Sequence, residues 1–206
     1  MAKENLRKSV SFSRRRPTRI EKESFLIICE GENTEPEYFK SFRLSSARVK
    51  TIAYTNKGNA FNFVNAAITE KNKRGKDFDN YWVVFDMDAN SKQDFNSAIQ
   101  LAKANKLKVA YSNQAFELWY LLHFSYIQNE MHRRLYKRKL DELLPFPYDK
   151  DKNTAKNMYA ALLNKQSDAI ANARKAYEEI GNHQSPADEE SSTTVYKLVE
   201  VLNKFL

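Results

Sequence analysis

The segment FLIICEGENTEPEYF, residues 25–39, contains the start of the fold and an abrupt change in chemistry. Four apolar side chains and a cysteine come first, as expected of a β-strand that is buried on both faces. Glu30 follows at once, then Gly31 and three more acidic residues. Pro36 stands near the start of a helical pattern, where its missing N–H group costs nothing. The segment therefore predicts a strand that ends in a glutamate, followed by a helix.

The same alternation of strand and helix continues through residue 113. Three further β-prone runs are VKTIAY at 49–54, YWVVFD at 81–86 and KVAYSN at 108–113, and helical spacing separates them. Strands that alternate with helices predict a parallel sheet covered on both faces. We therefore expect an α/β fold with a parallel sheet of about four strands.

Composition divides the chain into three regions. Residues 1–22 contain eight Lys or Arg against two Glu and lack an apolar pattern, which predicts a flexible basic arm. Residues 23–125 form the expected α/β core. Residues 126–206 read as helices broken at PFPY, 145–148, and at GNHQSPADEESS, 181–192, and predict a helical C-terminal annex packed on the core.

Overall composition limits the classes of protein. The 206 residues include 42% hydrophobic residues, enough for one substantial core, and carry a net charge of +8. That charge favours a polyanionic partner such as nucleic acid, although a solvated basic surface is the alternative. A single cysteine excludes a disulfide framework within the chain, and no apolar run approaches the length of a membrane span. We expect a cytoplasmic protein with no membrane contact.

Acidic residues follow two of the predicted strands. Glu30 ends the first strand, Asp86 ends the third, and Asp88 comes two residues later. Because parallel strands point their carboxyl ends at one crevice, these carboxylates meet if the two strands are neighbours. A hard divalent cation would relieve their repulsion, so we predict a Mg²⁺ site that also accepts Mn²⁺. Taken alone, the DMD motif is weak, since acids after a strand often cap the next helix.

The apolar segment AFELWYLLHF, residues 115–124, contains two polar side chains. Glu117 is expensive to bury unless it is paired or bound to a metal, so a docking salt bridge and a metal role both stay open. His123 lies six residues later and faces a different direction on a helix. We expect a hydrogen-bonded structural histidine there, with general acid catalysis as the alternative.

Basic residues offer candidate phosphate contacts. Nucleic-acid binding is predicted for Arg14, Arg15 and Arg16 in the arm, for Arg133, Arg134 and Lys137 in MHRRLYKRK, and for Lys197 in the last predicted helix. For the residues in MHRRLYKRK, the alternative is an ordinary charged helix face. Before the last helix, Thr193 and Thr194 are expected to cap it, with phosphate binding as the alternative.

Three motifs in this order resemble the RloB-like proteins of the Toprim superfamily. They are CEGENTEPEYF at 29–39, FDMD at 85–88 and SNQAFELWYLLHF at 112–124, and the closing SSTTVYKLVEVL is also similar. The resemblance covers the chain from Ser24 onward. Gln114 stands where the family pattern has a proline.

The resemblance implies a Toprim-like fold with Glu30, Asp86 and Asp88 as catalytic and metal-binding residues. It also implies Glu35 as a ligand for a second ion, although its five-residue spacing from Glu30 is one longer than the related pattern. RloB-like proteins are associated with bacterial anti-phage defence and abortive infection beside an ATPase of the ABC or AAA type. No GxxxxGK[ST] motif occurs in this chain, so ATP hydrolysis would fall to such a partner.

These observations lead to three functional hypotheses. We favour a Mg²⁺-dependent nuclease that acts on nucleic acid, for example tRNA or another RNA, as the effector of a defence system and under the control of a partner. The alternative is a catalytically silent binding or regulatory subunit of a complex with the ATPase. Phosphotransfer or nucleotide chemistry in the same crevice is the third. The polymer cleaved, the number of ions and the oligomeric state stay open.

Overall fold

A parallel four-stranded sheet forms the centre of the protein. The structure, a computed structural model, describes residues 22–55, 58–127 and 129–206. The strands are β1 (Glu23–Cys29), β2 (Ala47–Ala53), β3 (Asn80–Asp86) and β4 (Lys108–Ser112), in the order β2-β1-β3-β4. All neighbouring pairs are parallel. The predicted α/β class with about four parallel strands is confirmed, and the sheet is consistent with a Toprim-like fold.

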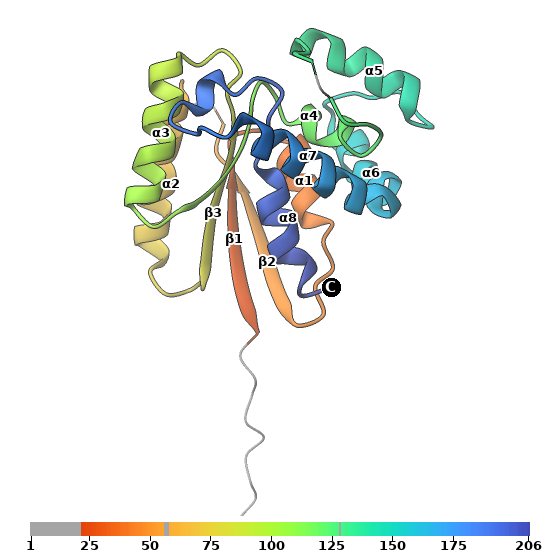
Figure 1. Cartoon of the computed structure of the whole chain (residues 1–206). Helices are drawn as coiled ribbons and strands as arrows, with labels where there is room; N and C mark the ends of the chain where they lie inside the picture. The colour runs from red at the N-terminus through yellow and green to blue at the C-terminus, as the bar shows by residue number, and fades with distance from the viewer. Residues whose placement is uncertain (1–21, 56–57, 128) are drawn as a thin grey trace, which may run out of the picture.

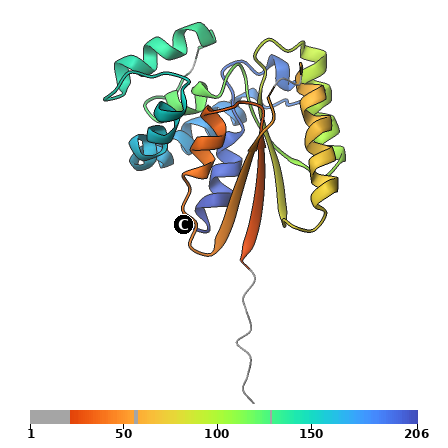
Figure 2. The same ribbon diagram turned by 180° about the vertical axis from the view of Figure 1, so that it is seen from behind.

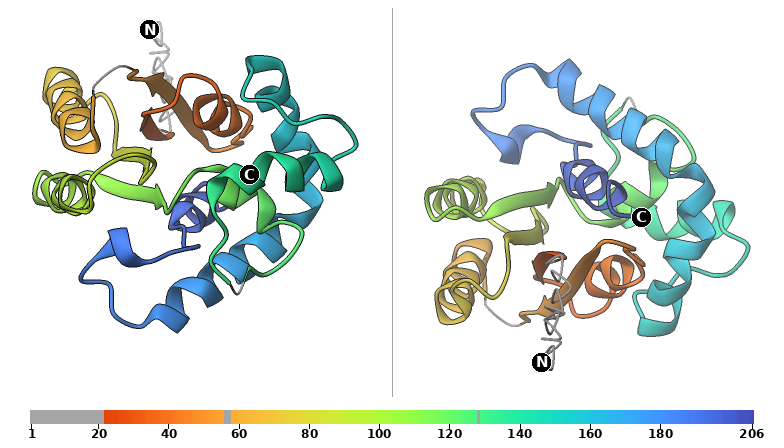
Figure 3. Two further views of the ribbon diagram at one scale, coloured as in Figure 1. Left: turned by 90° about the horizontal axis from the view of Figure 1, so that it is seen from above. Right: turned by 90° about the horizontal axis from the view of Figure 1, so that it is seen from below.

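Helices cover both faces of the sheet, as predicted. The helices are α1 (Thr34–Lys40), α2 (Ala60–Arg74), α3 (Lys92–Ala104), α4 (Glu117–Leu121), α5 (Tyr136–Leu143), α6 (Lys152–Leu162), α7 (Gln166–Ile180) and α8 (Val195–Asn203). Figure 1 and the reverse view in Figure 2 place α2 and α3 on one side of the strands and α1 and α8 on the other. The view along the strands in Figure 3 separates the same two layers.

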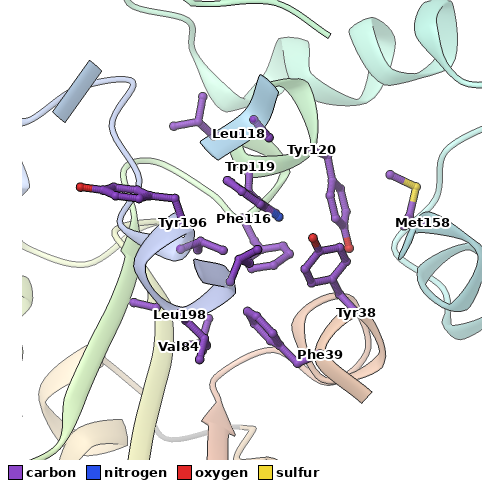
Figure 4. Packing of buried hydrophobic residues seen from close by; sticks show 14 of the residues in the cluster. Tyr38, Phe39, Val84, Phe116, Leu118, Trp119, Tyr120, Met158, Tyr196 and Leu198 are labelled. Carbon is purple, nitrogen blue, oxygen red and sulfur yellow. The ribbon is translucent and has the colours of Figure 1, made fainter. Parts of the chain in front are cut away.

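The buried strands supply a separate core to each helical layer. Alternate residues of β1 point to opposite faces, so Leu26 and Ile28 pack in the cluster with α2 and α3, whereas Phe25 and Ile27 pack in the other. This second cluster is large and aromatic. Figure 4 shows its side chains from α1, α8 and the region of α4, among them Tyr38, Trp119 and Leu198.

The chain returns to the sheet near its C-terminal end. Thr193 forms an antiparallel bridge with Ser112 of β4, and the Thr194 N–H group donates to the Tyr111 carbonyl at 2.8 Å. The following helix α8 then packs its apolar face in the aromatic cluster. The predicted division at residues 125 and 126 stays a prediction, but the end of the C-terminal region is hydrogen-bonded to the sheet.

Two predicted helices differ in extent from the structure. The helix expected over residues 115–124 is limited to α4, and α5 is preceded by a short 3-10 helix, η1 (Arg133–Leu135). Every residue of α4 is buried, which explains its apolar composition. Among the described residues, no helix is long and apolar enough to cross a membrane.

Candidate active site

A cleft of about 370 Å³ lies where β1 and β3 end. In Figure 1 these ends point upward, toward α4 and α5. The cleft lies between the turn after β1, the end of β3, the start of α4 and the segment before α6. It is lined by Glu30, Gly31, Glu32, Asn33, Thr34, Glu35, Asp86, Asp88, Phe116, Glu117 and Lys150. All five acidic residues singled out in the sequence therefore line one cleft, and their catalytic and metal-binding roles stay predictions.

The pairing of β1 with β3 brings Glu30 and Asp86 together. The Glu30 N–H group donates to the Val84 carbonyl at 3.0 Å, which extends the strand pairing by one residue. The Glu30 Oε2 atom in turn accepts from the Asp86 N–H group at 3.5 Å. Burial raises the pKa of Glu30 despite this hydrogen bond. The predicted convergence of the first and third strand ends is confirmed for this pair.

Asp86 is the most unusual carboxylate of the cleft. Its Oδ2 atom accepts from the Phe116 N–H group at 2.9 Å, whereas its Oδ1 atom is buried and has no hydrogen-bond partner. Burial, followed by the nearby charges of Glu35 and Glu117, raises the pKa of Asp86 well above its ordinary value. An unsatisfied buried oxygen is unfavourable, so this atom is a natural point of attachment for a proton or a cation.

Glu35 reaches the cleft from the first turn of α1. It is 5% exposed, and burial, with a further contribution from Glu117, raises its pKa to about 7. Gly31 makes room for it, because a Cβ atom at this position would overlap the Glu35 carboxylate group. The glycine after Glu30 thus lets the Glu35 carboxylate lie directly against the main chain of Gly31.

Asp88 lines the same cleft but is paired at its rim. Its side chain is 51% exposed and forms an ion pair with Arg133 of η1. Its backbone has a φ angle of 39°, in the left-handed region that Asp adopts more readily than most residues. Asp88 therefore lines the same cleft as Glu30 and Asp86, while its carboxylate is paired with Arg133.

Glu117 has the salt bridge that the sequence left open, and it also lines the cleft. Its Oε1 atom accepts from the Tyr148 hydroxyl at 2.7 Å and lies 2.8 Å from the Lys150 ammonium group. These contacts attach the segment before α6 to α4. Sequence reasoning missed Tyr148 and Lys150, because they reach the cleft only through tertiary packing and carry no local motif.

A complete set of metal ligands is absent from the part of the chain that the structure describes. There, no group of three or more His, Cys, Asp or Glu side chains is arranged so that it could hold a metal ion. The donor chemistry nevertheless suits a hard cation, since the lining residues supply carboxylate oxygens and Asp86 holds one of them free.

The predicted phosphate contacts fall in different places. Arg14, Arg15 and Arg16, with most of the arm, lie outside the described residues. Arg133 is at the rim of the cleft, where it pairs with Asp88. Lys137 donates to the carbonyl of Tyr148. Arg134 follows Arg133 in η1 and is exposed.

The remaining candidates lie in packed surroundings. The Lys197 ammonium group lies 3.7 Å from the Tyr177 ring centroid, and Thr193 and Thr194 are buried against β4, with the Thr193 hydroxyl accepting from the Val195 N–H group. His123 is 1% exposed and forms a hydrogen bond through Nδ1 with the Trp119 carbonyl. Burial lowers its pKa to about 4, so it is neutral at physiological pH, as a structural histidine.

Comparison with known proteins places the chain in a family. The model of the RloB-like protein family matches residues 25–202, which run from within β1 to all but the last residue of α8. No curated protein and no solved structure matches the chain. The matched range contains every residue of the cleft. The chain therefore belongs to the RloB-like protein family.

Proposed function

We propose that this RloB-like protein is a metal-dependent nuclease that cleaves nucleic acid in the cleft at the ends of β1 and β3. The observation that carries the proposal is the Asp86 carboxylate, which is buried beside Glu30 and Glu35 with its Oδ1 atom unpartnered. Crowding buried acids without donors is unfavourable unless protons or a cation neutralise them. A site that tolerates this arrangement is suited to a divalent cation.

Mg²⁺ or Mn²⁺ fits the oxygen donors of the cleft. Asp86 would be the central ligand, with Glu30 and Glu35 beside it, and Asp88 would join them once released from Arg133. When bound, the ion supplies positive charge to a phosphodiester and an acidified water molecule. If Glu35 and Asp86 hold the same ion, the site binds one ion. If each holds its own ion, the site binds two.

The protein's own residues support the handling of a phosphodiester. Burial holds a proton on Glu30 more firmly than in water, so Glu30 serves either as general acid or base or as a ligand. Lys150 lies at the cleft with its ammonium group fixed by Glu117 and bears the charge that a phosphate oxygen requires. Phe116, through its N–H group, keeps Asp86 oriented.

A polymeric nucleic acid is the proposed substrate. The cleft has Arg133 at its rim and Lys150 in its lining, and the sequence adds a basic arm before β1. We propose an RNA, for example tRNA, as the target. We propose anti-phage defence as the role, because RloB-like proteins are associated with it. An ABC- or AAA-type ATPase is the proposed partner that controls the activity.

A silent regulatory subunit is the second candidate. The pairing of Asp88 with Arg133 favours it, because a carboxylate held at the rim does not complete a metal site. In that case cleavage would require the partner, or would not belong to this chain.

Cleavage assays with labelled tRNA, total RNA and DNA, with Mg²⁺ or Mn²⁺ and with a chelator, test the proposal. We expect metal-dependent cleavage that Asp86→Asn lowers by about a hundredfold or more, since removal of a principal charge-stabilising group has effects of this size. Asp77→Asn is the matched control, because Asp77 is an exposed acid before the opposite, amino end of β3. Metal binding without cleavage, with or without the ATPase, would favour the silent subunit, and cleavage that Asp86→Asn retains would contradict the proposed site.

A further inference from the structure

Hydrogen bonds to one neighbouring residue hold the main chain of both partners in the ion pair between Asp88 and Arg133. Gln114 contacts both partners: its carbonyl accepts from the Asp88 N–H group at 2.9 Å, and its side-chain Oε1 atom accepts from the Arg133 N–H group at 2.9 Å. A single residue thus fixes the main chain on both sides of the pair.

The ion pair between Asp88 and Arg133 can be separated at small cost, so either residue can take another partner. The Asp88 and Arg133 side chains are 51% and 41% exposed, and exposed ion pairs contribute little to stability. Glu117 differs, because its side chain is 3% exposed and is tied to both Lys150 and Tyr148. Among the acids of the cleft, Asp88 is therefore the one whose partner can leave at small cost.

Two neighbouring cations are engaged elsewhere. Lys137 donates to the Tyr148 carbonyl, and Arg138 of α5 pairs with Glu142 at 3.9 Å. Arg133 is thus the cation of this segment whose partner is a lining acid of the cleft. A guanidinium group binds a phosphate at least as well as a carboxylate, and with the same two-pronged geometry.

We propose that Arg133 is a positioning residue that exchanges Asp88 for a phosphate of the nucleic acid, so that substrate binding frees Asp88 to complete the metal site. This inference rests on the proposed function, and it names the regulation of that site. Divalent metal and nucleic acid then reinforce each other's binding, and by linkage the enhancement is the same in both directions. Without nucleic acid, the pair holds the metal site incomplete.

The size of the effect follows from the strength of the pair. An exposed ion pair limits the enhancement to about fivefold in affinity. Removing the pair by Arg133→Ala should therefore raise Mn²⁺ affinity by up to this factor in the absence of nucleic acid. Loss of one positive charge also favours a cation, so a matched variant must remove the same charge. Arg138→Ala does so, and it also breaks an exposed ion pair, with Glu142.

The test measures Mn²⁺ affinity from the signal of the free ion in electron paramagnetic resonance. Wild type, Arg133→Ala, Arg138→Ala and Asp86→Asn are compared without and with a short single-stranded oligonucleotide whose phosphorothioate linkages resist cleavage. Samples of oligonucleotide alone correct for ions bound to it. Circular dichroism confirms that each variant is folded.

We expect Arg133→Ala to bind Mn²⁺ about two- to fivefold more tightly than Arg138→Ala without oligonucleotide. The oligonucleotide should tighten Mn²⁺ binding to wild type and Arg138→Ala and leave Arg133→Ala unchanged. Equal affinities of the two arginine variants, or equal tightening in both, would overturn the exchange while leaving the metal site intact. Mn²⁺ binding that Asp86→Asn does not weaken would overturn the metal site itself, and the exchange with it.

Discussion

The acidic cleft and the packed surroundings of Glu189 both contain buried carboxylates, but these carboxylates differ in how many hydrogen-bond donors they have. Glu189 is 3% exposed and surrounded by donors. The Tyr111 hydroxyl donates to its Oε2 atom at 2.5 Å, the Ser192 hydroxyl donates to the same atom, and His183 Nδ1 lies 2.9 Å from Oε1. In the cleft, Asp86 has one donor for its two oxygens, and three acids, Glu30, Glu35 and Glu117, lie near it.

The difference separates a structural carboxylate from one that is available to a ligand. A buried acid whose oxygens are saturated by donors connects elements, here β4 with the segment before α8. A buried acid with an unsatisfied oxygen destabilises the isolated fold and is retained where something else binds. The comparison predicts that substitutions in the two places will change stability in opposite directions.

The largest effect on stability is expected for Glu189→Ala. It leaves the Tyr111 and Ser192 hydroxyls and the His183 ring without their acceptor, and we expect a loss of about 3 kcal/mol in the free energy of unfolding. Urea denaturation followed by circular dichroism measures it. The neighbouring Glu190→Ala is the control, because Glu190 is exposed. A loss below that of the control would show that Glu189 is not a structural acid.

A total effect of similar size is expected from the titration of Glu35. Its pKa is about 7 in the folded protein against 4.5 as the ordinary value, so the folded state holds the proton more tightly. Stability from this group is full below pH 4.5 and falls as the pH rises to about 7, by about 1.4 kcal/mol for each pKa unit.

Denaturation at a series of pH values, with metal removed by a chelator, measures this slope. Glu35→Gln should flatten it and leave the protein more stable than wild type above pH 7. Mg²⁺ or Mn²⁺ should stabilise the wild type most at high pH, because metal binding competes with protons. A slope that Glu35→Gln leaves unchanged would contradict the assignment.

The smallest effect is expected for Gly31→Ala. The added methyl group displaces the Glu35 carboxylate, which can swing aside, so we expect a change in stability of about 1 kcal/mol. The pH slope of Glu35 should flatten at the same time, because the displaced acid is less buried. Combining Gly31→Ala with Glu35→Ala tests the cause: the glycine substitution should have no further effect once the carboxylate is gone. Additive effects would show that the two residues are not coupled.

The sequence predicts the backbone of the site better than its side-chain contacts. Glu30 and Asp86 could be placed at one edge because strand ends are visible in apolar runs, and their meeting required only that the strands be neighbours. Asp88 follows the same strand, yet its partner Arg133 lies 45 residues further on in a segment that reads simply as a charged helix. Side-chain pairing across such a distance depends on tertiary packing, which a single sequence does not encode locally.

The contacts of the C-terminal region were the least predictable. Residues 182–194 have no periodic apolar pattern. Nevertheless, Glu189 and Thr193 form hydrogen bonds with β4, and the Ser192 carbonyl accepts from the N–H group of Asn113, which follows β4. Lys150 and Tyr148 reach Glu117 from a proline-rich break that looked like a simple connection. In these segments hydrogen bonds to the main chain and to buried acids take the place of an apolar pattern, so hydrophobic periodicity could not reveal them.

The antiparallel bridge between Ser112 and Thr193 also has a consequence for synthesis on the ribosome. Its partners are 81 residues apart, and α8, which covers one face of the sheet, follows the second of them. While the intervening residues are translated, the apolar face that will receive α8 stays uncovered in the nascent chain. Such late, long-range contacts slow folding and expose aggregation-prone surface. This layer of the sheet is therefore completed only after residues 193–203 have emerged.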